Sequence, residues 1–386
     1  MPINLEQRPI FVIGGERSGT TLIMSILGCH PNIAVPEVAW YYPRFRPYIH
    51  TYGDLSDIEN LGTLCEEMAY GLKTPFWDMD VNPATFGQEI TEAAREKESS
   101  FAGAYCAMLD RFAREMGKPR WGEKTPYNMF YMKEILEDFP NAQFIFITRD
   151  GRDASADYLE SSFGPTNIYC AAKLWNMGQD AVKPFRESLP TDQWYEVLYE
   201  DFVTEPEKYL RDICAYINEE YTDELLNFHQ TKIAQRRGQT KDHAPLGSPV
   251  SDKYVGIYKN LLSKRDQGIF AWVAGENAAE LGYEDFAEKE VLSDVQIKYY
   301  EELDGRYRAV TLEAPEGHLV IDSYYDWLAD QRASRNASGK WLPIPDPAPF
   351  PLGHEMEEVL TGARAWRKWK DKFSIKRQYY TNDIVL

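Results

Sequence analysis

Residues 10–21 read IFVIGGERSGTT, and this stretch decides the fold. Residues 10–13 are a continuous apolar run, which is typical of a strand that is buried on both faces. A glycine-rich turn follows at residues 14–21, and the apolar residues 22–27 then predict a helix. A buried strand, a glycine-rich turn and a helix together favour an α/β protein with a parallel sheet.

The turn has the glycine spacing of a nucleotide-binding phosphate loop, G-x-x-x-x-G-K-S/T, at Gly14 and Gly19. Backbone N–H groups in such a turn, together with the N-terminus of the next helix, attract an anion. However, Thr20 stands where that loop has its lysine, and a cation, Arg17, lies three residues earlier. This pattern predicts a site for phosphate-like groups without a metal, whereas the alternative is a tight turn that binds nothing.

Two further strands, at residues 144–147 and 195–199, are each followed by a polar turn and a helical pattern. We therefore predict a three-layer α/β fold with a central parallel sheet flanked by helices. Residues 40–116 are helical and aromatic, and we expect them to form an insertion over the carboxyl edge of the sheet.

The remaining organisation follows from composition. We predict one domain over residues 1–290, a helical extension over 291–342, and a proline-rich connector with a basic tail, packed on the body, over 343–386. The 386 residues carry a formal charge of −19, which disfavours nucleic acid and anionic membranes as partners. The five cysteines form no C-x-x-C pair and no apolar run could span a membrane, so we expect a cytoplasmic protein with free thiols.

Two more motifs carry charge. Residues 148–153 read TRDGRD directly after a strand, so Arg149 should point into the crevice where α/β sheets bind ligands, and Arg152 would add a second fork for phosphate. An ion-pair network with the neighbouring aspartates is the alternative. Residues 121–126 read WGEKTP, which places Lys124 beside a proline-fixed turn, either facing the site or in a capped loop.

Together these motifs, in this order, resemble the sulfotransferase superfamily, which uses 3′-phosphoadenosine 5′-phosphosulfate (PAPS). The resemblance covers residues 8–286 and is nearest to the branch that includes tyrosylprotein sulfotransferases and bacterial relatives. It implies the general base Glu37 and two cations, Arg17 and Lys124, that stabilise the transferring sulfonyl group. It also implies cofactor contacts from these residues: Gly15, Arg17, Ser18, Gly19, Thr20, Thr21, Arg149, Asp157, Ser251, Tyr254 and Lys259.

One position departs from the family pattern. Asp157 stands where the family has the serine that contacts the 3′-phosphate. A serine of the same helix, at position 155, 161 or 162, would substitute, or Arg152 would neutralise Asp157, or the donor preference would differ. A histidine base, His50 or His243, is the alternative to Glu37, which could also be a solvated loop carboxylate.

The acceptor site is predicted from the aromatic insertion. Trp40, Tyr41 and Trp77, with Glu37, would line a pocket for a small hydroxylated metabolite or a glycan, rather than a peptide tyrosine, unless these rings are core. No metal site is expected from the spacing of the histidines, and a homodimer is left open. Two rival classes remain: a phosphate-loop kinase or nucleotide hydrolase, and a non-catalytic nucleotide-binding module.

Overall fold

The computed structural model describes most of the first 310 residues and a short segment further on. The described positions are 8–36, 40–70, 77, 82–161, 164–310, 328, 330, 331, 333–335, 337 and 338, with the side chains of 83 and 305–310 left aside. The predicted base Glu37, the alternative Ser162 and the predicted tail 343–386 lie outside these residues.

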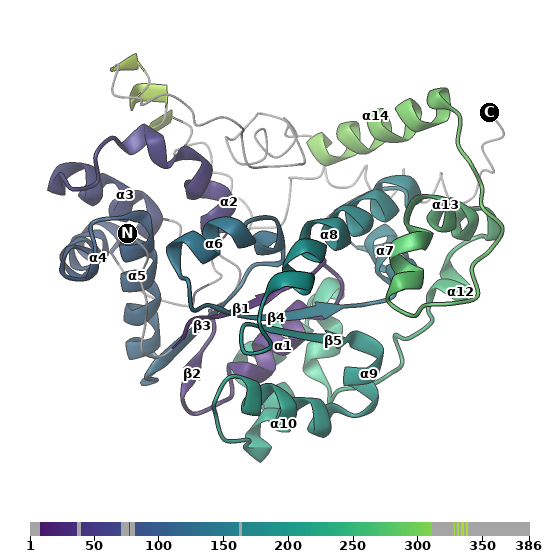
Figure 1. Cartoon of the computed structure of the whole chain (residues 1–386), viewed down its shortest axis with the longest axis horizontal. Helices are drawn as coiled ribbons and strands as arrows, with labels where there is room; N and C mark the ends of the chain where they lie inside the picture. Colours follow the sequence, from purple (N-terminus) through teal and green to yellow (C-terminus); the bar gives the residue numbers. More distant parts are fainter. Residues whose placement is uncertain are drawn as a thin grey trace.

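The described residues form one five-stranded parallel sheet with the order β2-β3-β1-β4-β5, as Figure 1 shows. Its strands are β1 (Ile10–Ile13), β2 (Ile33–Ala34), β3 (Arg120–Lys124), β4 (Gln143–Thr148) and β5 (Trp194–Leu198). The central parallel sheet flanked by helices confirms the predicted α/β class.

The apolar runs in β1 and β4 are buried on both faces, because successive side chains of a strand point to opposite sides. Phe11 and Phe144 belong to the core on one side of the sheet. Ile10 and Ile145 belong to the core on the other side. The continuous hydrophobic pattern thus has a direct structural cause.

Strand β3 was not recognisable as a strand, since its sequence RWGEK is polar, yet all five residues are buried. Its first residue shows how the burial is compensated. The Arg120 guanidinium donates to the carbonyl oxygens of Ile217 (2.6 Å) and Arg8 (2.8 Å) and to the side-chain oxygen of Gln143 (2.8 Å). Tertiary hydrogen bonds, rather than an apolar pattern, stabilise this strand in the sheet.

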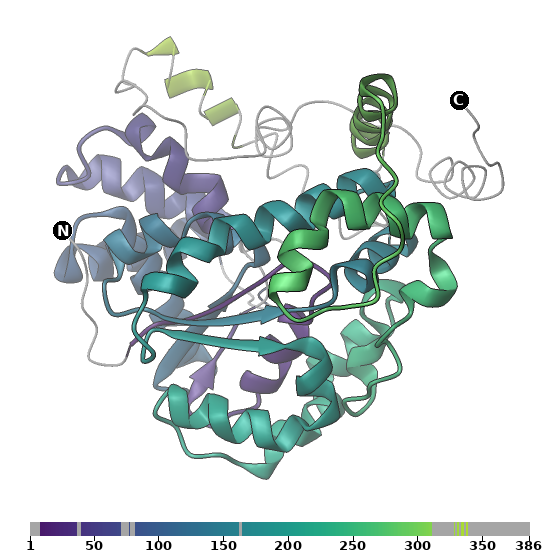
Figure 2. The ribbon, with the colours of Figure 1, turned by 45° about the vertical axis from the view of Figure 1, so that its right-hand side comes forward.

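Helices cover both faces of the sheet. In Figures 1 and 2, α1, α9 and α10 lie below the sheet, whereas α6 and α8 lie above it. The helices on the lower side are α1 (Thr20–Leu27), α9 (Tyr199–Thr204), α10 (Pro206–Tyr216) and, further along, α11 (Lys232–Gly238). The others are α6 (Met132–Asp138), α7 (Gly151–Glu160), α8 (Ile168–Ser188), α12 (Tyr258–Leu261), α13 (Lys264–Glu280) and α14 (Asp294–Val310). Short 3-10 helices are η1 (Arg46–Tyr52), η3 (Pro126–Phe130), η4 (Asp223–Gln230) and η5 (Lys241–Gly247).

The described part of the predicted insertion is helical. Its helices are α2 (Tyr41–Phe45), α3 (Ile58–Tyr70), α4 (Pro83–Lys97) and α5 (Phe101–Glu115). Two of them have side-chain N-caps: Asn82 accepts from the backbone N–H of Ala84, and Ser100 accepts from that of Gly103. The buried face of α5 packs against β2 and β3, so the insertion extends the core on the side of the sheet that holds Phe11.

A segment far along the chain packs on this insertion. Arg335 forms an ion pair with the buried Glu67 of α3, and its guanidinium lies 4.3 Å from the ring centre of Tyr52. Tyr52 also donates its hydroxyl hydrogen to Glu67 at 2.5 Å, and Leu328 is fully buried in the same core. Among the described helices, none is long and apolar enough to cross a membrane.

Candidate active site

The carboxyl ends of three neighbouring strands bring the predicted motifs together. Strand β1 lies between β3 and β4, with Val12 paired to Lys124 and Ile13 paired to Phe146. The glycine-rich loop after β1 therefore lies between Lys124 on one side and the loop that follows Thr148 on the other. This is the edge where parallel α/β sheets bind ligands.

The glycines of the loop are required by space and backbone geometry. A Cβ atom on Gly14 would lie 2.2 Å from the carbonyl oxygen of Ile147, and one on Gly19, at φ +101°, would lie 2.9 Å from the Tyr199 ring. Arg17 also has a left-handed backbone, with φ +65°. A non-glycine residue in this region costs roughly 1–2 kcal/mol, so the loop is held in a strained shape that directs the Arg17 side chain into the site.

Arg17 is tied to three parts of the chain. Its Nη1 donates to the carbonyl oxygen of Asp242 (2.8 Å), and its Nη2 donates to Asp157 Oδ1 (2.6 Å). Its own carbonyl oxygen accepts from Arg149 Nη1 at 3.0 Å, and that same nitrogen donates to Asp157 Oδ2 at 3.0 Å. Asp157 is therefore neutralised by Arg17 and Arg149, and the expectation that Arg152 would neutralise it is wrong.

Lys124, at the end of β3, reaches the loop that the sequence shows without a lysine. Its Nζ lies 3.4 Å from Thr21 Oγ1, so an ammonium group from a neighbouring strand stands beside the N-terminus of α1. Burial lowers the pKa of Lys124 to about 8, although the nearby carboxylates of Glu123 and Glu16 act in the opposite direction. The Lys124 ammonium group is thus cationic at neutral pH and loses its proton as the pH rises above about 8.

Glu123 holds this turn in place. Its carboxylate accepts from Thr125 Oγ1 (2.5 Å) and from Asn128 Nδ2 (2.5 Å), which ties the end of β3 to the following 3-10 helix. Burial raises the pKa of Glu123 to about 7, and its hydrogen bonds and Lys124 oppose that rise. We infer that Glu123 positions the turn that carries Lys124, since its two oxygens are already engaged.

The two arginines of the TRDGRD motif have different surroundings. Arg149 lies in the site, where Nη2 also donates to the carbonyl oxygen of Tyr254 at 2.6 Å. Arg152 instead pairs with Asp150 (2.7 Å) and donates to the carbonyl oxygen of Glu284 (2.9 Å). Arg152 therefore fixes the loop near residue 284, and the alternative of an ion pair with a neighbouring aspartate is the correct one for it.

Three buried polar atoms at the site have no hydrogen-bond partner among the described residues: Ser18 Oγ, Arg149 Nε and Ser155 Oγ. By contrast, Ser161 donates its hydroxyl hydrogen to the carbonyl oxygen of Tyr158 at 3.0 Å. Buried polar atoms nearly always have a hydrogen-bond partner. These three atoms, which have none among the described residues, therefore suit a ligand with several acceptor oxygens.

The segment that carries three of the predicted cofactor residues, Ser251, Tyr254 and Lys259, lies next to this centre. Asp153 accepts from the backbone N–H of Gly256 at 2.6 Å, and this bond holds the segment against α7. Tyr254 contacts the site through its carbonyl oxygen, which accepts from Arg149. Ser251 Oγ accepts from the backbone N–H of Lys253, and Lys259 is exposed. Of these three predicted contacts, Tyr254 is the one that the structure joins to Arg149.

The aromatic residues predicted to line the acceptor pocket differ in how deeply they are buried. Tyr41 and Trp77 are each 2% exposed and pack edge to face with ring centres 5.7 Å apart, so they are core residues, which was the alternative for these rings. Trp40, at the N-terminus of α2, is half-buried, with its ring centre 4.9 Å from that of Tyr127 in η3. The sequence pattern does not separate the two cases, because both are aromatic residues in a helical segment.

The two histidine alternatives also differ. His50 is buried in η1. His243 lies in η5, beside the site, where burial lowers its pKa to about 3 and the charges of Arg237, Arg17 and Lys124 add to the shift. His243 is therefore neutral at pH 7 and surrounded by cations.

Tyr199 is a site residue that was not singled out from the sequence. Its ring lies under the Arg149 guanidinium, 4.9 Å from the ring centre, and touches the position of a Gly19 side chain. An aromatic residue at the last position of a predicted strand, at the same edge of the sheet as the loop, was the available signal.

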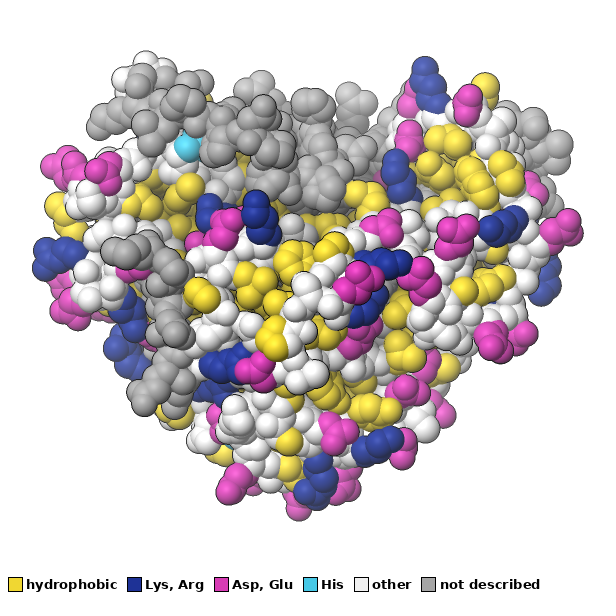
Figure 3. Space-filling view, viewed as in Figure 1, with side chains coloured by type: hydrophobic (Ala, Val, Ile, Leu, Met, Phe, Trp, Pro, Cys, Tyr) yellow, Lys and Arg dark blue, Asp and Glu magenta, His cyan; other side chains and the backbone are white. Residues whose placement is uncertain are grey.

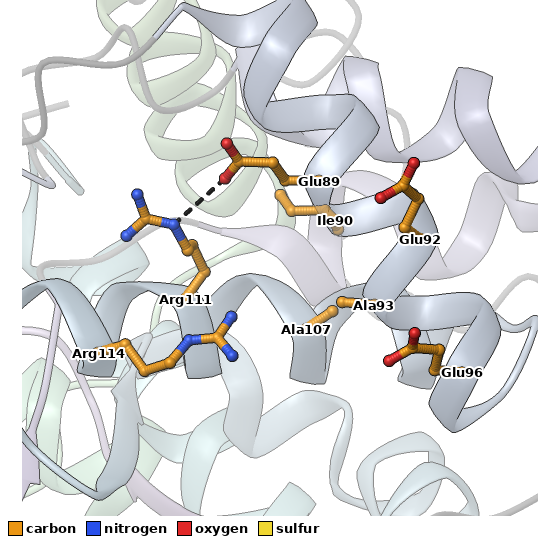
Figure 4. A pocket seen from close by; sticks show the side chains of 8 residues that line it. All are labelled: Glu89, Ile90, Glu92, Ala93, Glu96, Ala107, Arg111 and Arg114. Carbon is orange, nitrogen blue, oxygen red and sulfur yellow. Dashed lines mark hydrogen bonds and ion pairs between the residues drawn. The ribbon is translucent and has the colours of Figure 1, made fainter.

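A hollow of about 470 Å³ lies between α4 and α5, away from the strand ends (Figure 4). It is lined by Glu89, Ile90, Glu92, Ala93, Glu96, Ala107, Arg111 and Arg114, and Arg111 pairs with Glu89 at 3.3 Å. None of the predicted motifs contributes to it. Within the described residues, no group of three or more acidic, histidine or cysteine side chains could hold a metal ion.

The fold and this edge define an α/β protein with a phosphate-loop-like turn and a candidate anion site. Residues 9–223 match the model of the Sulfotransferase family, and the chain belongs to that family. An Aquifex aeolicus protein of uncharacterised function is 28% identical over 242 residues, covering 58% of this chain and 27% of its own. A Drosophila melanogaster protein-tyrosine sulfotransferase is 23% identical over 240 residues, covering 61% of this chain and 42% of its own.

The matches thus span less than half the length of these two curated relatives. A solved structure, the sulfotransferase domain of the Synechococcus PCC 7002 olefin synthase, shares the fold. Its TM-score is 0.52 at 15% identity, and the match covers 74% of this chain and 99% of that one.

Proposed function

We propose that the chain is a sulfotransferase that moves a sulfonyl group from PAPS to an acceptor hydroxyl. The observation that carries this proposal is the convergence of Arg17, Lys124 and Arg149 beside a glycine-rich loop at the helix N-terminus. Guanidinium forks and backbone N–H groups match phosphate and sulfate oxygens. Family membership supports the same reaction.

The residues present fit such a donor. Ser18 Oγ and Arg149 Nε are buried donors with no partner among the described residues, so an acceptor oxygen of the donor could satisfy them. We assign the 5′-phosphosulfate to the loop with Arg17 and Lys124, and the 3′-phosphate to the side of Arg149. The donor, when bound, supplies the sulfonyl group, and adenosine 3′,5′-bisphosphate is the leaving group.

The chain's own residues then have defined tasks. Lys124 and Arg17 stabilise negative charge that develops around the sulfonyl group, which for one such donor is worth roughly 10²–10³ in rate. Glu37 takes the proton of the acceptor hydroxyl, a task worth roughly 10²–10⁴. His243 suits that task less well, because its pKa of about 3 makes it a weak base.

For the acceptor, we propose a small hydroxylated molecule or a glycan in a cytoplasmic setting. The charge of −19 supports a neutral or cationic acceptor over a polyanion. On the face shown in Figure 3, Lys and Arg side chains are scattered among Asp and Glu. A peptide tyrosine is the second candidate, since a relative carries the name protein-tyrosine sulfotransferase. A panel of one tyrosine peptide, one phenol and one sugar, assayed with labelled PAPS, separates these acceptors.

Binding of the donor product tests the proposal most directly. We expect calorimetry to show micromolar binding of adenosine 3′,5′-bisphosphate and no binding of ATP with magnesium. Arg149→Ala should weaken the bisphosphate at least about tenfold, because charge-assisted hydrogen bonds contribute roughly 1.5–3 kcal/mol. The matched control is Arg211→Ala, which removes an exposed guanidinium paired with Glu207. Binding of ATP with magnesium instead would favour the kinase or hydrolase class.

The pKa of Lys124 gives a pH dependence. Its pKa of about 8 in the folded chain means that the cation is lost as the pH rises above that value. The affinity for the bisphosphate should therefore fall roughly tenfold between pH 7 and pH 9, the loss expected from one titrating cation. Lys124→Arg should remove this fall, because arginine stays charged. An equal fall in both proteins would mean that another group is responsible.

A further inference from the structure

Asp157 forms ion pairs with two cations of the proposed donor site, Arg17 and Arg149. It lies near the end of α7, and its two oxygens accept from Arg17 Nη2 (2.6 Å) and Arg149 Nη1 (3.0 Å). The side chains of the two arginines are 12% and 3% exposed, whereas that of Asp157 is 21% exposed. The carboxylate thus lies on the open side of a bridge between two mostly buried guanidinium groups.

A carboxylate and a phosphate or sulfate oxygen bind a guanidinium in the same way. The N–H groups that Asp157 engages on Arg17 and Arg149 are therefore the ones that an anionic ligand needs. Helix α7 keeps the carboxylate in place, since Asp153, one turn earlier, is anchored by the backbone N–H groups of Gly256 (2.6 Å) and Tyr258 (2.9 Å). The carboxylate is consequently a fixed internal anion at high local concentration.

We propose that Asp157 is a built-in competitor of the donor nucleotide, which keeps Arg17 and Arg149 paired in the ligand-free chain and is displaced when the donor binds. The inference rests on the proposed function. In this role Asp157 holds both guanidinium groups in position and weakens the binding of the nucleotide. It forms its ion pairs with the two arginines again as the bisphosphate product leaves. Asp157 is a residue that sets affinity and product release, and it takes no part in the chemical step.

The test is calorimetry of adenosine 3′,5′-bisphosphate binding to the full chain and to Asp157→Asn. The amide has the same shape but no charge, so it competes poorly, and we expect the dissociation constant to fall at least tenfold. Glu187→Gln is the matched control, because it removes one charge from an exposed position on α8 and should change the constant less than twofold. Asp157→Ser, a smaller neutral residue, should also bind more tightly, and serves if the asparagine variant does not fold.

Each outcome decides between the proposals. Equal or weaker binding by a folded Asp157 variant would overturn the competitor role and show that the carboxylate supports the site by holding Arg17. Tighter binding by Glu187→Gln to the same extent would also overturn it, since long-range charge would then explain the gain. If neither the unaltered chain nor the variants bind the bisphosphate, the proposed function itself fails, and this inference fails with it.

Discussion

Replacing Arg17 by alanine should lower kcat/KM for sulfonyl transfer by about 10³-fold, the upper range for loss of one preorganised donor to a developing charge. Arg17 has a left-handed backbone, and its side chain spans from the glycine-rich loop to Asp157. The loss should appear mainly in kcat, since Lys124 and Arg149 would still hold the ground-state donor. Steady-state kinetics with labelled PAPS and an acceptor found in the panel measures it.

Two companion variants make this result specific. Glu37→Gln should reduce transfer while leaving bisphosphate affinity unchanged, because a base acts on the acceptor and not on the nucleotide. Arg17→Ala should remain folded, because Asp157 keeps Arg149 as its partner, and urea unfolding checks this. A loss of less than tenfold in a folded Arg17→Ala protein would refute the assignment of Arg17 to the transferring group.

Replacing Arg335 by alanine should destabilise the chain by about 3 kcal/mol, because the buried Glu67 carboxylate loses charge-assisted hydrogen bonds that are worth roughly 1.5–3 kcal/mol each. The side chains of Glu67 and Arg335 are 4% and 14% exposed, and a second bond joins Nη2 to Oε2 at 3.2 Å. Without the guanidinium, the Glu67 carboxylate keeps the hydrogen bond from the Tyr52 hydroxyl but loses both bonds to Arg335. Urea unfolding followed by fluorescence gives the free energy directly.

The control for this variant is Lys183→Ala, which breaks an ion pair with Glu280 whose side chains are 41% and 54% exposed. It should cost less than about 1 kcal/mol, because exposed pairs are weak. Adding Glu67→Gln to Arg335→Ala should restore part of the stability, since the double variant buries one negative charge fewer. Unaltered stability of Arg335→Ala would mean that the segment around residue 335 contributes nothing to the packing of the insertion.

The sequence predicted the parts of the fold that rest on local pattern. Strands β1, β4 and β5 follow from apolar runs, and the glycine-rich loop follows from its spacing. Strand β3 was not predicted, because a polar strand becomes buried only through tertiary partners such as those of Arg120. Strand β2 is two residues long and has no periodicity of its own.

Part of the candidate site could be predicted from the sequence, because some of its residues belong to recognisable local motifs. Arg149 was predicted from its position directly after a predicted strand, whereas Lys124 was predicted from its place beside a proline-fixed turn and from the family resemblance, since β3 itself was not predicted. The partner of Asp157 was not, because Arg17 lies 140 positions away and nothing local distinguishes it from Arg152. Nor does composition separate a core ring such as Trp77 from one near a ligand, since burial depends on which helix faces pack together.

The long reach of Arg17 affects how the chain comes to be active during synthesis. Strand β1 pairs only with strands made more than a hundred residues later, and Arg17 takes its carbonyl partner from Asp242, 225 positions downstream. Contacts of such high sequence separation form slowly and late, so β1 lacks its neighbouring strands until they have been synthesised. Under the proposed function, the Arg17 side of the donor site is therefore complete only once η5 has been made, and N-terminal fragments that end before η5 should bind no donor.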